Sequence, residues 1–107
     1  MAIRSYRGRD TEAFAAGERV RAFQQCERRA VKALTKLQAV ERLIELRNPP
    51  SNEFEAMRGD RQGEYSIRID RKWRVCFKWA PHEPAPEGVD ALMVPGEPYD
   101  VEITDPH

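Results

Sequence analysis

The chain has 107 residues, of which 40% are hydrophobic and 34% charged, a composition typical of a folded domain and not of a disordered or membrane-embedded protein. Eighteen basic residues balance 18 acidic ones, and zero net charge taken alone argues against a nucleic-acid partner. The charges are unevenly distributed, because residues 1–50 carry 11 basic and 6 acidic side chains, whereas residues 81–107 carry 7 acidic side chains and no basic one. A basic body with an acidic tail still allows a cationic surface that binds phosphate.

No stretch approaches the roughly 18 apolar residues that a membrane helix needs, and the first residues lack the apolar core of a signal peptide. We therefore expect a cytoplasmic protein with no membrane partner. Cys26 and Cys76 are far apart in the sequence, with no second pair that completes a zinc site. We expect reduced, buried thiols and neither a metal nor a cofactor.

The N-terminal half predicts a short strand followed by helices. Ile3–Tyr6 resembles an opening strand, and Asp10 with Thr11 can cap a helix. The main amphipathic stretch, Gln25–Leu46, has an apolar stripe that we expect to face the core. Its members recur every three residues: Val31, Leu34, Leu37, Val40, Leu43 and Leu46. Since this repeat drifts around a helix of 3.6 residues per turn, we expect a break near Gln38–Glu41.

The C-terminal half predicts strands. After the prolines of Asn48–Asn52 end the helical part, residues 64–70 and 73–79 alternate between polar and apolar side chains, and Asp70–Lys72 is short enough to join them as a hairpin. Proline-rich residues 81–98 predict a loop insertion, and Tyr99–Thr104 predicts a last strand. We therefore expect a single α+β domain over residues 1–107, with helices on one face of a mainly antiparallel sheet.

Arginines in this region carry the candidate binding chemistry. The segment Arg58–Gly63 contains two glycines, and taken alone it is typical of a tight turn with solvated charges. Arg68 and Arg74 both fall on the polar side of their strands, although the sequence does not fix the register across the turn. If they share a face, converging guanidinium groups would bind an RNA phosphate and stabilise the charge of its transition state.

Two residues are candidates for proton transfer, and a third could orient one of them. His107 titrates near neutrality, as RNA cleavage requires, although a terminal residue is also commonly frayed. Asp105 either orients this imidazole or is a turn residue, and Glu55 is either a second proton-transfer group or a surface carboxylate paired with Arg58. Because the RNA 2′-hydroxyl is a built-in nucleophile, such a site needs a base, an acid and a cationic cradle, but no metal.

Six segments, taken in order, resemble the HigB branch of the RelE/ParE toxin superfamily. They are Ile3-Arg4-Ser5-Tyr6, Leu46-Arg47-Asn48-Pro49-Pro50-Ser51-Asn52, Gly59-Asp60-Arg61-Gln62-Gly63, Tyr65-Ser66-Ile67-Arg68-Ile69, Lys72-Trp73-Arg74-Val75-Cys76-Phe77 and Asp100-Val101-Glu102-Ile103-Thr104-Asp105-Pro106-His107. Each motif is weak singly, and their order is specific. The similarity covers nearly the whole chain except for the longer segment at residues 81–98.

The resemblance implies a RelE-like fold and the toxin of a type II toxin-antitoxin system, a ribosome-dependent endoribonuclease (mRNA interferase) that stops translation and growth. It also implies a helix-turn-helix, HigA-like antitoxin, with promoter DNA bound only through that antitoxin. The catalytic residues that it implies are Glu55, Arg58, Arg68, Arg74, Asp105 and His107. The RNA-binding residues are Arg58, Arg61, Arg68, Lys72 and Arg74, with no metal ligand.

One departure from the family concerns the C-terminus. The family typically ends in Asp-Tyr-His, whereas this chain has Asp105-Pro106-His107. Loss of the tyrosine predicts lower activity or altered codon choice, although a proline could also stiffen the terminal histidine. An alternative function follows, in which a catalytically weak module acts mainly with its antitoxin in transcriptional autoregulation.

Overall fold

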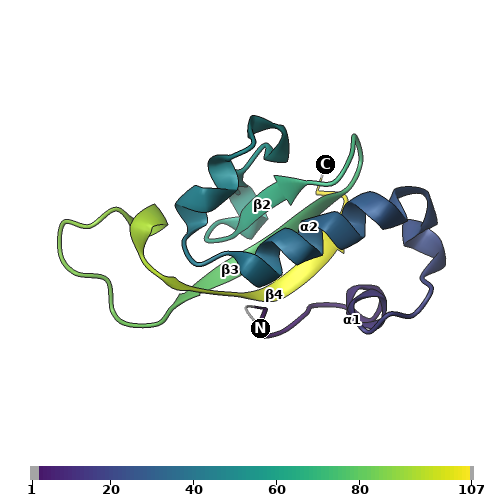
Figure 1. Ribbon diagram of the computed structural model, residues 1–107, viewed down its shortest axis with the longest axis horizontal. Coiled ribbons are helices and arrows are strands. Elements are labelled where there is room, and N and C mark those ends of the chain that lie inside the picture. The colour runs from purple at the N-terminus through teal and green to yellow at the C-terminus, as the bar shows by residue number, and fades with distance from the viewer. Residues whose placement is uncertain (1–2, 107) are drawn as a thin grey trace.

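The computed structural model describes residues 3–106 as an α+β fold, with helices against one face of a four-stranded antiparallel sheet (Figure 1). The helices are α1 (Arg9–Ala15) and α2 (Glu27–Ala39), and the strands, in their order across the sheet, are β1 (Glu55–Ala56), β2 (Tyr65–Arg68), β3 (Arg74–Pro81) and β4 (Gly96–Thr104). Short 3₁₀ segments connect them: η1 (Arg21–Cys26), η2 (Leu43–Arg47), η3 (Pro50–Asn52), η4 (Gly59–Arg61) and η5 (Ala91–Met93). The predicted fold class is confirmed.

The amphipathic stretch is divided where the sequence predicts a break. α2 ends at Ala39, Val40 adopts extended backbone with φ −73° and ψ 138°, and η2 begins at Leu43. Val40 and Leu43 are both buried, so the change of direction keeps successive members of the apolar stripe against the core. Within residues 3–106, no helix has both the length and the apolar character that crossing a membrane requires.

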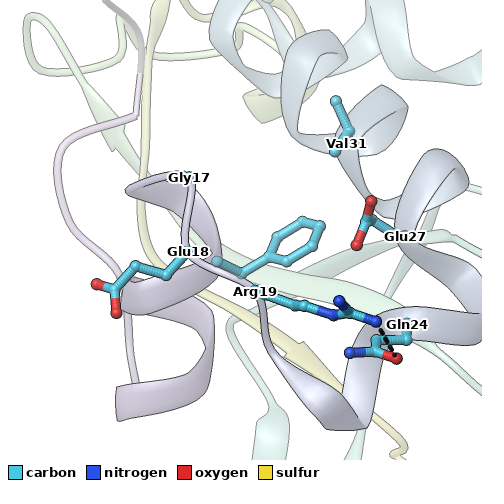
Figure 2. Close-up of a pocket in the computed structure, with 7 residues that line it drawn as sticks. Gly17, Glu18, Arg19, Gln24, Glu27 and Val31 are labelled. Carbon is cyan, nitrogen blue, oxygen red and sulfur yellow. Dashed lines mark hydrogen bonds between the residues drawn. The ribbon is translucent and has the colours of Figure 1, made fainter.

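Val31 is the member of the stripe for which the prediction was wrong. Its side chain is 51% exposed, whereas Leu34 and Leu37 are buried, and Figure 2 shows it on α2 at the rim of a cavity. Each three-residue step falls about 60° short of a full helical turn. A stripe centred on Leu34 and Leu37 therefore leaves Val31 on the outer side, and Ala30 and Ala33 complete the buried side.

The N-terminal segment adds less sheet than expected. Tyr6 forms an isolated parallel bridge with Val101, and the Arg4 N–H donates to the Pro98 carbonyl at 2.9 Å. The strand predicted at Ile3–Tyr6 is therefore reduced to a bridge along the outer edge of β4.

The start of α1 also differs from the prediction. The residue before the helix is Gly8, with φ 86° and no side-chain cap, so Asp10 and Thr11 lie inside the helix. Thr11 is 2% exposed, and its Oγ1 accepts a hydrogen bond from the Ile103 N–H at 3.1 Å. The hydroxyl thus fastens α1 to β4 instead of capping a helix.

The predicted hairpin of β2 and β3 is confirmed, and its turn fixes the register. Oδ1 of Asp70 accepts hydrogen bonds from the N–H groups of Lys72 at 2.9 Å and Trp73 at 2.8 Å. This turn places Arg68 directly opposite Arg74. The two arginines therefore share a face, as their alternation with apolar residues allows.

The strands β3 and β4 are longer than predicted. Pro81 pairs with Gly96 and Trp79 with Pro98, so the connection comprises residues 82–95 instead of 81–98, and Figure 1 shows it extending from the end of the sheet. Prolines are tolerated at sheet edges and strand ends, where a missing N–H removes no required ladder bond. Their presence in this segment therefore did not exclude strands.

The core lies between α2 and the sheet. Ile67, Val75 and Phe77 are at most 1% exposed, as is Leu37 of α2. Alternation along the strands then sends Arg68, Arg74 and their neighbours to the opposite side.

Phe77→Ala tests this core. We expect a loss of about 3–5 kcal/mol in the free energy of unfolding, because the substitution removes a buried ring and leaves a cavity. Val31→Ala is the matched control, for which we expect a change within about 0.5 kcal/mol. Urea denaturation followed by circular dichroism measures both, and comparable losses would contradict the core assignment.

Candidate functional site

The sheet surface that faces away from the helices carries two rows of cross-strand neighbours. One row runs from Arg68 through Arg74 to Thr104, and the other from Glu55 through Ser66 and Cys76 to Glu102. The backbone pairing that defines both rows is antiparallel throughout. We call these seven residues the distal face, and it contains Glu55, Arg68 and Arg74 of the predicted site.

Arg74 is the most firmly held of the predicted site residues. Its side chain is 11% exposed, its Nε donates to Ser66 Oγ at 2.9 Å, and its Nη2 donates to the Glu53 carbonyl. Glu55 Oε1 lies 3.8 Å from the same Nη2. Charge-assisted hydrogen bonds of this kind hold the guanidinium in one orientation and satisfy its buried N–H groups.

Glu53 links the two arginines, although sequence reasoning did not select it. Its Oε2 lies 2.7 Å from Arg68 Nη1, and its Oε1 lies 3.9 Å from Arg74 Nη1. Its backbone is left-handed, with φ 45° and ψ 50°, a conformation that is uncommon for a residue with a long side chain. The Glu53 carboxylate thus takes an anion position that a phosphate could occupy.

A second group of ion pairs surrounds Arg61, a predicted RNA-binding residue. Arg61 lies 3.1 Å from carboxylate oxygens of both Glu64 and Glu102, and Arg7 lies 3.4 Å and 3.7 Å from the same two groups. Burial alone lowers the pKa of Arg61, but its interactions with Glu102 and Glu64 outweigh this effect and raise the pKa. The Arg61 charge is therefore largely compensated inside the fold.

Cys76 lies at the centre of the distal face and is completely buried. Desolvation, with a further contribution from the Glu64 carboxylate, outweighs the nearby guanidinium groups and raises the pKa of its thiol from 9.0 to about 11. The thiol is protonated at neutral pH, so it lacks the thiolate that nucleophilic attack requires. Both cysteines are free and buried, which confirms the expected thiols.

The other predicted residues lie around this face. Arg58 is exposed, directly before η4, and forms no ion pair within residues 3–106. Lys72 is exposed in the hairpin turn, with Nζ 5.1 Å from the Trp73 ring centroid. Asp105 is exposed and directly follows Thr104, the residue opposite Arg74. His107 lies outside the described residues.

The cavity shown in Figure 2 differs from this surface. It lies between the end of α1 and the start of α2, has a volume of about 490 Å³, and contains Arg19, whose guanidinium donates to Gln24 at 3.3 Å. No pair of arginines faces it. Among residues 3–106, no three His, Cys, Asp or Glu side chains are grouped so that they could hold a metal ion.

Comparison with known proteins identifies the family. A family model described as the RelE-like toxin of type II toxin-antitoxin system HigB matches residues 11–90. The chain belongs to this family. It is also 40% identical over 43 residues to toxin HigB-1 of Vibrio cholerae serotype O1, an alignment that covers 40% of this chain and 45% of that relative. The chain therefore matches somewhat less than half of the relative's length.

These matches confirm the resemblance drawn from the motifs and delimit it. The family match includes β1, β2 and β3, and with them Glu55, Arg58, Arg68 and Arg74. It ends before β4, so the terminal Asp105-Pro106-His107 lies beyond it. The assignment of these terminal residues therefore depends on the motif resemblance.

The geometry of Glu53 generates a prediction about anion binding. Glu53→Gln should raise the affinity for pyrophosphate about two- to fivefold, because it removes a competing carboxylate whose exposed ion pair contributes up to about 1 kcal/mol. Isothermal titration calorimetry measures the change. Glu97→Gln is the control, since Glu97 also forms an ion pair, with Arg4, but lies outside the distal face. Equal affinities in the two variants would contradict the prediction.

The environment of Cys76 generates a prediction about pH. The pKa of the Cys76 thiol is 9.0 without the fold and about 11 within it. This difference stabilises the folded state fully below pH 9, and the stabilisation is lost as the pH rises towards 11. Relative to Cys76→Ala, the wild-type free energy of unfolding should fall by about 2–3 kcal/mol over this interval. Urea titrations at pH 8, 9, 10 and 11 measure it. A constant difference between the two proteins would show that the thiol titrates normally.

Proposed function

We propose that this HigB-like toxin is an endoribonuclease that cleaves messenger RNA on the ribosome without a metal ion and thereby inhibits translation. The observation that carries the proposal is the direct pairing of Arg68 with Arg74 on the distal face. The last strand, β4, ends beside this pair, because Thr104 lies opposite Arg74. Family membership supports its action as a toxin.

The reaction that we propose uses the RNA as its own nucleophile. The 2′-oxygen attacks the adjacent phosphorus, the bond from phosphorus to the 5′-oxygen breaks, and the products are a 2′,3′-cyclic phosphate and a 5′-hydroxyl. Arg58, Arg68 and Arg74 bind the phosphate oxygens and stabilise the negative charge that increases in the transition state. The buried hydrogen bonds of Arg74 support this role, because a fixed guanidinium needs little reorganisation during the reaction.

Two groups are proposed to move the protons. His107 transfers a proton between the 2′-hydroxyl and the leaving 5′-oxygen, and Asp105 orients its imidazole. Glu55 is the second candidate, and its carboxylate, 3.8 Å from Arg74 Nη2, is close to where the phosphate would bind. Cys76 takes no part, because its thiol stays protonated.

Two further basic residues are proposed to contact RNA beside the scissile phosphate. Lys72 extends from the hairpin turn next to the Trp73 ring, so a flanking phosphate could reach it without any rearrangement. Arg61 would have to exchange one of its carboxylate partners, Glu64 or Glu102, for a phosphate. We therefore expect Arg61 to contribute less to RNA binding than Lys72.

The proposed partners are those of a type II system. A helix-turn-helix, HigA-like antitoxin would restrain the toxin in the cytoplasm and connect it to promoter DNA. The ribosome would present the messenger RNA. The exposed 82–95 connection carries Glu83, Glu87 and Asp90 and no Lys or Arg, so it repels free RNA and favours cleavage in the ribosomal setting.

The test is to induce the chain in a bacterial host without an antitoxin and to follow growth and new messenger RNA ends. Wild type should arrest growth and produce cuts within codons. Arg74→Ala should reduce cleavage by about 10²- to 10³-fold, and Arg74→Lys should restore it only in part, because lysine lacks the planar fork. Arg68→Ala and His107→Ala should also relieve the arrest, whereas Arg21→Ala should not, because Arg21 is exposed and lies outside the distal face.

Circular dichroism of each purified variant separates loss of activity from loss of folding, which matters most for the buried Arg74. Cleavage by purified wild type should also require ribosomes. Normal growth with intact messages would refute the nuclease proposal and favour the binding module that acts with its antitoxin, with Pro106 as the cause of inactivity. Full toxicity of His107→Ala would remove that histidine from the mechanism.

A further inference from the structure

A second cationic surface lies on the helix side of the sheet, next to Arg68. It is a groove of about 360 Å³ between α2, η3 and the end of β2. Four basic side chains line it, namely Arg29, Lys32 and Lys36 of α2 and Arg68 of β2. We call it the α2 groove.

The positive charge of the α2 groove is only partly neutralised, because Arg68 pairs with Glu53 whereas the cations on α2 have no carboxylate partner within residues 3–106. Asp70 supplies its one carboxylate, and Oδ1 of that residue already accepts the N–H groups of the hairpin turn. Lys36 donates to Asn52 Oδ1, but the side chains of Arg29 and Lys32 form neither a hydrogen bond nor an ion pair within residues 3–106. These two exposed cations are therefore available to an anionic ligand.

The spacing of the cations indicates a linear polyanion. Arg29, Lys32 and Lys36 follow one another at three and four residues, which places them on one side of a helix and spreads them over about 10 Å along its axis. A single small anion could contact only part of such a row. A chain of phosphates could contact all of it.

The α2 groove is continuous with the distal face. β1 pairs with β2 only at Tyr65 and Ser66, so the edge of β2 at Ile67 and Arg68 carries no neighbouring strand. Arg68 lines the groove and also forms the ion pair with Glu53 on the distal face. Arg68 thus belongs to both surfaces, and a bound chain could pass around it from one to the other.

The lining of the α2 groove favours RNA over a protein segment. Its apolar members are Ala33 and Ile69, which are only 5% and 6% exposed, so it offers no apolar or aromatic pocket of the kind that anchors protein partners. We propose that the α2 groove binds the phosphate backbone of the RNA segment that flanks the cleavage site. This proposal extends the proposed function and depends on the substrate being RNA.

The test compares two variants that lose the same charge. Arg29→Ala/Lys32→Ala removes two groove cations, and Arg21→Ala/Arg47→Ala removes two exposed arginines that lie outside α2 and do not line the groove. The probe is a fluorescent single-stranded RNA with 2′-O-methyl groups, which cannot be cleaved because its nucleophile is blocked. Fluorescence anisotropy over a series of KCl concentrations gives the slope of log affinity against log salt.

We expect the groove variant to lower the magnitude of this slope by about 1.4, the value for two lost phosphate contacts on a single strand, and the control variant to leave it nearly unchanged. Equal slopes in the two variants would overturn the proposal. So would an unchanged RNA slope combined with a selective loss of poly-glutamate binding, because the groove would then fit an acidic protein segment.

Failure of this inference is distinguishable from failure of the nuclease proposal. If Arg74→Ala relieves growth arrest while the groove variant binds RNA as the control does, the nuclease stands and the α2 groove is rejected. If wild type causes no arrest but the groove variant shows the reduced slope, the groove binds RNA and the nuclease proposal fails.

Discussion

The pairing of β3 with strands on both sides determines the arrangement of the rest of the molecule. β3 meets β2 through a turn held by Asp70 and meets β4 after the 82–95 connection. Because alternation is strict at the end of the sheet where β3 begins, Val75 turns towards α2 while Arg74 turns away. A shift of one residue in this register would exchange a core residue for a charged one. The core and the arginine pair therefore depend on the same backbone hydrogen bonds.

Carboxylates on and beside the distal face explain how a chain of zero net charge can carry a concentrated arginine site. Arg74 is almost buried, and burying an isolated charge is costly. Glu53 and Glu55 compensate the charge of Arg74, and Glu64 and Glu102 compensate that of Arg61. The face is thus close to neutral without a ligand, and it can bind an anion only by exchanging one acid for another.

The sequence could predict what depends on period and turn chemistry, including the break near Gln38–Glu41 and the hairpin. It allowed a common face for Arg68 and Arg74 but did not fix the register that produces it. It could not predict contacts between segments that are distant in sequence. The carboxylate of Glu53 meets Arg74 across 21 positions, and the left-handed backbone that directs it has no glycine to indicate it. Thr11 was misread for the same reason, because its partner Ile103 lies 92 positions away. Residue propensities reflect interactions between neighbours along the chain, whereas these contacts join residues that meet only in the folded protein.

The position of Glu53 has a consequence for substrate selection. An anion that enters between Arg68 and Arg74 must first displace a carboxylate from both, so a single phosphate gains little net binding energy there. A polyanion that also occupied the α2 groove would gain contacts with Arg29 and Lys32, whose side chains have no competing carboxylate within residues 3–106. Attachment of one segment would then raise the effective concentration of the next. Favourable contacts made away from the reacting phosphate can then offset the free-energy cost of displacing the Glu53 carboxylate. If RNA is the substrate, as we propose, this arrangement would discriminate against free nucleotides and favour a long strand.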